Sequence, residues 1–139
     1  MSEQNVELHR RINEAFTAGD LEAWLALADP SIECRSAFAL GGVYHGHEGI
    51  RTWFGDLREA WGGELRLESE AYFDLDDETL CFNLVRGRGR HSEVEVEMKT
   101  AQVLRWRDGL CVFLKGYLNR DDALKDLGLS ADALEPIAP

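Results

Sequence analysis

The chain has 139 residues, 45% of them hydrophobic and 29% charged, which fits one globular domain around a single core. Its formal net charge of -11 at pH 7 would repel a nucleic-acid backbone or an anionic membrane surface, so we expect neither as a partner. No apolar run approaches the ~20 residues of a membrane span, and the start, MSEQNVELHRR, lacks the apolar segment of a secretion signal. We expect a cytoplasmic protein. Its three cysteines, Cys34, Cys81 and Cys111, should be reduced thiols, because their number is odd and no C-x-x-C spacing occurs.

Two amphipathic helices are predicted at the N-terminus, over residues 3–18 and 21–28, because apolar side chains recur there with helical spacing. Between them, Gly19 can adopt the left-handed conformation that ends a helix. Asp20 can accept the hydrogen bond that begins the next one, which stops before Pro30. The two helices should therefore meet at a tight corner.

A short strand is predicted over residues 31–36, followed by a glycine-containing loop and a third helix over about residues 48–61. After Gly62-Gly63 the apolar period changes from 3.6 to 2, which indicates a strand over residues 65–75. Asp76-Asp77 marks a turn, and residues 79–85 are apolar on both faces, as in a central strand. The second part of the chain should therefore be a sheet.

Charge predicts the register of the next hairpin. If the chain turns at His91-Ser92, three arginines face three glutamates, and each pair contributes about 0.2–1 kcal/mol. The pairs are Arg90 with Glu93, Arg88 with Glu95 and Arg86 with Glu97. The arginine run could instead bind an anionic ligand, but the opposing glutamates would neutralise it, so we interpret it as a set of cross-strand pairs.

The other face of the same long strand is interpreted as core, and it carries Val94, Val96, Met98, Thr100, Gln102, Leu104 and Trp106. A three-residue loop, Arg107-Asp108-Gly109, is expected next, pairing Trp106 with Leu110. This loop aligns Leu110, Val112, Leu114 and Gly116 with the core, whereas a two-residue loop would place Lys115 beside Gln102 and bury an ammonium group. A last helix over residues 121–127 should end at Gly128. We expect a domain of residues 1–128 and a mobile tail of residues 129–139.

Helices followed by long antiparallel strands describe an α+β fold. Four segments resemble the nuclear-transport-factor-2-like superfamily, specifically its SnoaL-like branch, which includes polyketide cyclases and ketosteroid isomerase-like proteins. They are Ala18-Gly19-Asp20, the run Tyr44-His45-Gly46-His47-Glu48-Gly49-Ile50, Arg107-Asp108-Gly109, and the run from Tyr117 to Leu124. The resemblance implies a cone-shaped, curved antiparallel sheet of the cystatin-like roll type, wrapped around a pocket that three N-terminal helices cover. It also implies a common pairing into homodimers, but not one chemistry.

Ketosteroid isomerase gives the sharpest comparison, because it needs a carboxylate base and acidic donors to the enolate oxygen. At the positions that correspond to its three catalytic groups, this chain has Ile12, Cys34 and Gln102. Steroid isomerisation is therefore not expected, although Gln102 can still donate a hydrogen bond to a ligand carbonyl.

Three side chains remain as weak catalytic candidates: His47, Gln102 and Cys34. His45, His47 and Glu48 allow a metal site as an alternative, but no third ligand follows from spacing, and His47 is equally suited to capping the third helix. We expect no metal and no cofactor. The acidic residues Glu33, Glu93, Glu95 and Glu97 are interpreted as surface charges.

The predicted function is binding of a small, mostly apolar molecule in a conical pocket, with a possible isomerase, cyclase or lyase activity. The alternative is a non-catalytic ligand-binding or dimerisation module. The expected pocket residues are Ile12, Phe16, Cys34, Trp53, Phe54, Trp61, Met98, Thr100, Gln102 and Leu114.

The outer sheet face is expected to be apolar, because Ala101, Cys111 and three larger side chains alternate there with charged residues. A contiguous apolar patch usually marks an interface. We therefore expect a homodimer through this face, with Val103, Phe113 and Tyr117 at its centre.

Overall fold

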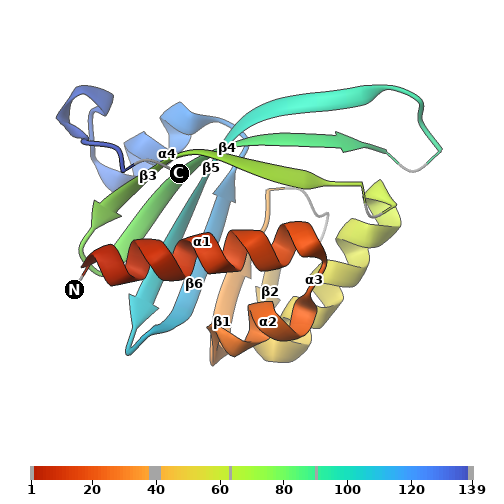
Figure 1. Ribbon diagram of the computed structural model, residues 1–139, viewed down its shortest axis with the longest axis horizontal. Helices are drawn as coiled ribbons and strands as arrows, with labels where there is room; N and C mark the ends of the chain where they lie inside the picture. Colours follow the sequence, from red (N-terminus) through yellow and green to blue (C-terminus); the bar gives the residue numbers. More distant parts are fainter. Residues whose placement is uncertain (1, 38–41, 63, 90, 138–139) are drawn as a thin grey trace.

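The computed structural model describes residues 2–37, 42–62, 64–89 and 91–137 (Figure 1). One six-stranded sheet has the order β2-β1-β6-β5-β4-β3. Its strands pair antiparallel except for β1 and β6, which are parallel, so the sheet is mixed rather than wholly antiparallel. The elements are α1 (Ser2–Ala18), α2 (Leu21–Ala26), β1 (Ala28–Arg35), β2 (Val43–His45), α3 (Gly46–Trp61), β3 (Arg66–Leu75), β4 (Glu78–Arg88), β5 (Glu95–Arg107), β6 (Leu110–Tyr117), α4 (Arg120–Leu127) and a 3-10 turn (Ala131–Ala133).

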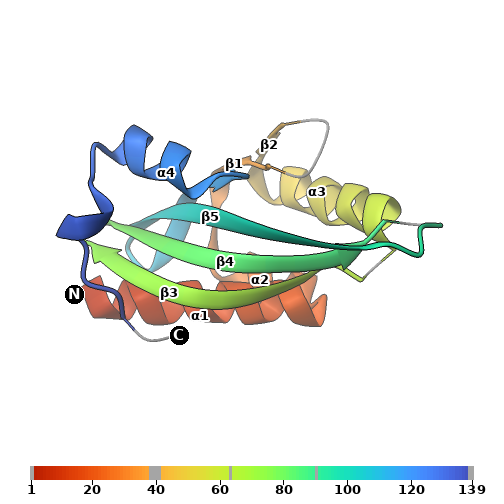
Figure 2. The same ribbon diagram turned by 90° about the horizontal axis from the view of Figure 1, so that it is seen from above.

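The helices cover both faces of the curved sheet. α1 and α4 lie on opposite faces (Figures 1 and 2), α2 packs against α1, and α3 packs against β1 and β2. The main core cluster lies between the concave face and the first three helices. The α+β fold class is thus confirmed. None of the helices in the described ranges is long and apolar enough to cross a membrane.

The corner between α1 and α2 forms as the sequence predicts. Gly19 has a φ of 68°, and the Asp20 side chain accepts a hydrogen bond from the backbone N–H of Ala23 at 3.1 Å. β1 begins earlier than expected, at Ala28, and β2 was not expected. This three-residue strand pairs with the end of β1 and is too short to show a period-2 pattern.

The register of the β4–β5 hairpin is confirmed where the chain is described. Arg86 faces Glu97 and Arg88 faces Glu95, whereas the pair expected at Arg90 lies outside the described residues. The ion pairs extend further than expected, since Arg86 lies 3.4 Å from both Glu97 and Glu68. Each exposed pair contributes little by itself.

The core face of β5 is shorter than expected. The hairpin extends beyond the body of the sheet as an arm (Figure 1), and Val94 and Val96 on it are 68% and 37% exposed. They continue the alternation of Thr100 and Leu104 but remain open to solvent. The prediction that they belong to the core is wrong. A period-2 pattern shows which side chains share a face of the sheet, but not whether other elements bury that face.

The last hairpin differs from the predicted one. Its loop has two residues, Asp108 and Gly109, with φ values of 54° and 79°, as a type I′ turn requires. A β-bulge follows, so that Val112 has no partner in the register. Lys115 therefore stands opposite Val103 on the outer face, and no ammonium is buried. The bulge, and not a three-residue loop, thus keeps Lys115 out of the core.

The same bulge changes the surroundings of Cys111. Cys111, expected on the outer face, is fully buried in the main core cluster. Beyond the bulge, Leu114 faces Leu104 and Gly116 faces Gln102, so both lie on the concave face as expected.

The apolar outer face is largely covered by the chain itself. α4 packs on it through Ala123 and Leu124, and Ala101 and Val103 are only 1% and 3% exposed. Val103 is therefore not available for the expected dimer interface unless α4 moves. Tyr117 is partly buried here, and its hydroxyl donates to Asp126 on α4 at 2.7 Å.

The chain after Gly128, expected to be a tail, packs against the domain as far as Ile137. Leu129 and Leu134 pack against the cluster beneath α4. Ile137 exchanges two backbone hydrogen bonds with Tyr72 on the edge strand β3, at 3.1 and 2.6 Å. The segment therefore covers part of an otherwise open sheet edge.

If α4 is an integral part of the core, Leu124→Ala should lower the free energy of unfolding by about 2–4 kcal/mol, because Leu124 is 8% exposed and its truncation leaves a cavity. Leu118→Ala is the matched control, since Leu118 is 58% exposed and its loss should cost less than about 0.5 kcal/mol. Urea unfolding measures both values. Equal effects would show that α4 does not cover the sheet in solution.

Candidate functional site

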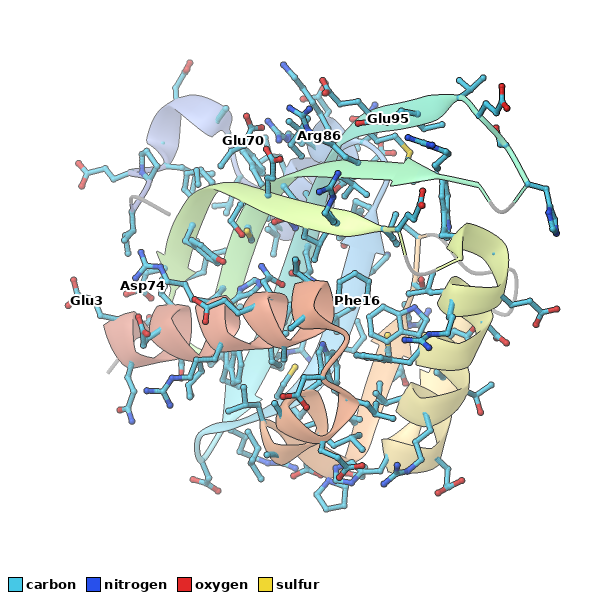
Figure 3. The ribbon with its side chains drawn as sticks, turned by 45° about the vertical axis from the view of Figure 1, so that its right-hand side comes forward. Glu3, Phe16, Glu70, Asp74, Arg86 and Glu95 are labelled. Atoms are coloured by element: carbon cyan, nitrogen blue, oxygen red, sulfur yellow. The ribbon has the colours of Figure 1, made fainter. Side chains whose placement is uncertain are left out.

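A narrow cavity opens between α1, α3 and the concave face of the sheet. Its volume is about 30 Å³, room for only one or two water molecules. Phe16 projects from the last turns of α1 into this region (Figure 3). The described residues that line the cavity are Phe16, Ser36, Ala37, Trp53, Leu67, Asn83, Thr100, Ala101, Gln102, Leu114 and Gly116.

The structure brings half of the predicted pocket residues to this cavity: Phe16, Trp53, Thr100, Gln102 and Leu114. The other five do not line it. Ile12 and Cys34 are fully buried in the adjoining core, and Met98 is partly buried against it. Phe54 lines an outer groove beside α1, and Trp61 lines a separate surface hollow near the end of α3.

Gln102 is held by a chain of buried hydrogen bonds that the sequence analysis missed. Its Oε1 lies 2.7 Å from Nε2 of His9, and Nδ1 of the same ring lies 2.7 Å from the hydroxyl of Thr79. The indole N–H of Trp106 donates to that hydroxyl at 2.9 Å. His9 and Thr79 are both fully buried.

The direction of this chain follows from the Gln102 oxygen. An amide oxygen can only accept, so Nε2 of the His9 ring carries the hydrogen and donates to Oε1 of Gln102. Nδ1 of the uncharged ring then accepts from the Thr79 hydroxyl, whose oxygen accepts the indole N–H of Trp106. With its oxygen directed to His9, Gln102 presents its amide N–H groups on the other side.

Burial keeps the His9 ring neutral. Desolvation lowers the pKa of His9 from 6.5 to about 4, although the hydrogen bond to Gln102 acts in the opposite direction. At neutral pH the ring is therefore an uncharged link between two hydrogen bonds.

A second buried polar cluster lies beside the first. The Asn13 amide nitrogen donates to the hydroxyl of Tyr72 at 3.2 Å, and that hydroxyl lies 2.8 Å from the hydroxyl of Ser69. Ser69 and the thiol of Cys81 both donate to Oδ1 of Asn83, at 3.3 and 3.0 Å. Asn83 lines the cavity, so this cluster also ends there.

The thiols are poor nucleophiles here. Burial raises the pKa of Cys34 far above its usual range and the pKa of Cys81 and Cys111 to about 12. Of the three catalytic candidates, Gln102 lines the cavity, whereas Cys34 and His47 do not.

The two loop histidines lie at the start of α3. His47 donates from Nε2 to the backbone carbonyl of Ala28 at 2.9 Å, and thereby ties the helix to β1. It does not cap α3, whose N-cap residue is His45, and the His45 side chain makes no capping hydrogen bond within the described helix. Within the described ranges, no group of three His, Cys, Asp or Glu side chains is placed to hold a metal ion.

Sequence reasoning missed His9 and Asn13 because it followed only the apolar positions of α1. The two residues are four positions apart, so they lie on the same face of the helix, which also carries Ile12 and Phe16. Two polar side chains within a buried helical stripe were a usable signal, since buried polar groups need partners across the core.

Comparison with known proteins identifies the family. The model of the SnoaL-like domain matches residues 9–114. The chain belongs to the SnoaL-like domain family. No curated protein sequence matches this SnoaL-like chain.

Solved structures confirm the fold. A nuclear-transport-factor-2-like protein of unknown function from Burkholderia pseudomallei superposes with a TM-score of 0.76 at 18% identity, covering 88% of this chain and 95% of that one. TerC, co-crystallised with polyporic acid, gives 0.74 at 19% identity, with 88% and 96% covered. Rv0760c from Mycobacterium tuberculosis, in complex with estradiol-17β-hemisuccinate, gives 0.70 at 20% identity, with 85% and 95% covered.

The buried His9 makes stability depend on pH. Its pKa is lower in the folded state than in the unfolded chain, so acidification from pH 6.5 to 4 protonates only the unfolded chain. We expect the wild type to lose about 3 kcal/mol more over this range than a His9→Gln variant. Urea unfolding at several pH values measures the difference. Parallel curves for the two proteins would contradict the neutral ring.

Proposed function

We propose that this SnoaL-like protein binds a small, mostly apolar molecule in the cavity between α1, α3 and the sheet, and that Gln102 anchors one oxygen of that molecule. The observation that carries the proposal is the directed chain from Trp106 to Gln102, which leaves amide N–H donors in an otherwise largely apolar space. A few placed polar groups in an apolar pocket are typical of small-molecule sites. Relatives of the same fold support the idea, since TerC was crystallised with polyporic acid and Rv0760c with an estradiol ester.

The lining favours binding over acid–base catalysis. None of the described residues that line the cavity has a side chain that ionises near neutral pH. His9 lies behind Gln102, and both its ring nitrogens are engaged. A cyclase, isomerase or lyase acting here would have to rely on Gln102 polarising a carbonyl, so the non-catalytic binding module is the second candidate.

Phe16 accounts for the small size of the cavity. It lines both the inner cavity and an outer groove of about 400 Å³ that runs beside Gly19, Phe54 and Leu65. Rotation of this one side chain would join the two spaces into a volume typical of ligand sites. We therefore assign Phe16 as the partition through which a ligand gains room.

We also propose that the protein is a cytoplasmic homodimer. The three buried free thiols suit a reducing compartment. Because α4 covers Val103, the dimer would use the remaining outer face around Phe113, which lies beneath the guanidinium of Arg105. Sedimentation at micromolar concentration tests this proposal, and a monomer would overturn it.

Substitutions of Gln102 test the anchor. Gln102→Leu should weaken ligand binding roughly tenfold and destabilise the free protein by about 1–3 kcal/mol, because the Nε2–H of His9 loses its acceptor. Gln102→Glu keeps an acceptor for His9 but presents no N–H to the ligand, so it should lose affinity as well. Gln4→Leu, at an exposed glutamine on α1, is the control.

Thermal unfolding with a panel of ketones, quinones and aromatic esters provides the readout. A ligand at ~100 times its dissociation constant adds about 2.7 kcal/mol, a rise of roughly 5–15 °C in the midpoint. Equal shifts in the wild type and in both Gln102 variants would refute Gln102 as the anchor.

Removal of the partition should widen the range of ligands. We expect Phe16→Ala to bind bulkier members of the same panel at least tenfold more tightly than the wild type does, because the inner and outer spaces become continuous. Phe54→Ala enlarges only the outer groove and should leave the size limit unchanged. Calorimetric titration compares the two variants, and identical profiles would exclude Phe16 as the partition.

A further inference from the structure

A second amide beside Gln102 has no role in the function proposed above. Asn83 on β4 is 1% exposed and lines the same cavity. We infer that Asn83 and Gln102 act together as a pair of N–H donors that selects a carbonyl oxygen. The inference rests on the proposed function and makes Asn83 a residue that determines ligand specificity.

The sheet places the two amides side by side. Asn83 faces Thr100 across the β4–β5 pair, and Gln102 is the next residue along β5 on the same face. Diagonal neighbours of this kind lie about 7–8 Å apart, within reach of two side chains that converge on one atom. Thr100, directly opposite Asn83, is 3% exposed and also lines the cavity.

The oxygen of each amide is already occupied on the side away from the cavity. Oδ1 of Asn83 accepts from Ser69 and Cys81, as Oε1 of Gln102 accepts from His9. The amide nitrogen of each makes no hydrogen bond to any residue in the described ranges, and neither nitrogen is fully enclosed by protein. Both sets of N–H donors are therefore open to an occupant of the cavity.

The second cluster lowers the stability of the fold at Asn13. Its amide nitrogen reaches Tyr72, Ser69 and Cys81, but its Oδ1 is buried without a hydrogen-bond partner among the described residues. An unsatisfied buried acceptor costs about 1–3 kcal/mol. Sites that break such rules are often functional, and here the cluster orients the oxygen of Asn83.

The backbone beneath the pair is held from the opposite face. Arg120, at the start of α4, donates to the carbonyl of Asn83 at 2.9 Å and to the carbonyl of Thr100 at 3.1 Å. It also stacks over Phe82 and pairs with Glu70. This contact fixes the spacing of the two strands where the amides project.

Two N–H donors match one carbonyl oxygen, which has two lone pairs and no hydrogen of its own. A ligand hydroxyl would add a hydrogen-bond donor to a pair of amides that already presents donors. A ligand ammonium has no lone pair with which to accept their hydrogen bonds. A buried polar group left unpaired is strongly selected against. The pair should therefore prefer a ketone, ester or amide to the matching alcohol or amine.

The test compares cyclohexanone with cyclohexanol, and acetophenone with 1-phenylethanol, by NMR titration at pH 7. The wild type should bind each ketone at least tenfold more tightly than its alcohol. Asn83→Leu should reduce that ratio to about one, mainly by weakening ketone binding. Asn83→Asp keeps an acceptor for Ser69 and Cys81 but offers the ketone no N–H, so it should have the same effect if the leucine variant does not fold.

The outcomes separate the two proposals. If Gln102→Leu weakens ketone binding but neither Asn83 variant does, the paired-donor inference fails and the single anchor stands. If substitutions at Gln102 and at Asn83 both leave ketone binding unchanged, or if the wild type binds neither ketone, the proposed function fails as well.

Discussion

Trp106 brings into the core an N–H that can donate a hydrogen bond but cannot accept one. At the other end of the same chain the amide oxygen of Gln102 can only accept, so Thr79, the His9 ring and Gln102 have one consistent arrangement of hydrogens. The arrangement needs a neutral imidazole, and complete burial of His9 provides it. A hydrogen-bond chain that joins Trp106 on β5 to His9 on α1 thus orients the side chain of Gln102 at the cavity.

The consequence for binding is a site rich in donors and poor in ionisable groups. Under the proposed function, such a site would recognise an uncharged oxygen while the rest of the ligand makes apolar contacts. It cannot easily hold a buried charge, because nothing in its described lining would neutralise one. The family fold supplies the curved sheet and its helical cover, but the side chains that meet inside it determine what is bound.

The sequence predicted the parts of this protein that depend on local pattern. Helical spacing located α1 and α3, and alternating charge set the register of Arg86 with Glu97. It could not show the bulge at Val112, because a bulge responds to the burial of residues on another strand. Gln102 was identified from its place on the core face of β5. His9, its partner, lies 93 positions away and became evident only when the fold brought them together.

The protonation state of His9 tests this account most directly. Long-range ¹⁵N NMR on protein labelled at histidine reports which ring nitrogen carries the hydrogen. The account predicts a neutral ring with hydrogen on Nε2 at pH 7, and no protonation until the pH falls to about 4. A hydrogen on Nδ1, or a ring charged at pH 6, would reverse or break the chain and leave Gln102 without a fixed orientation.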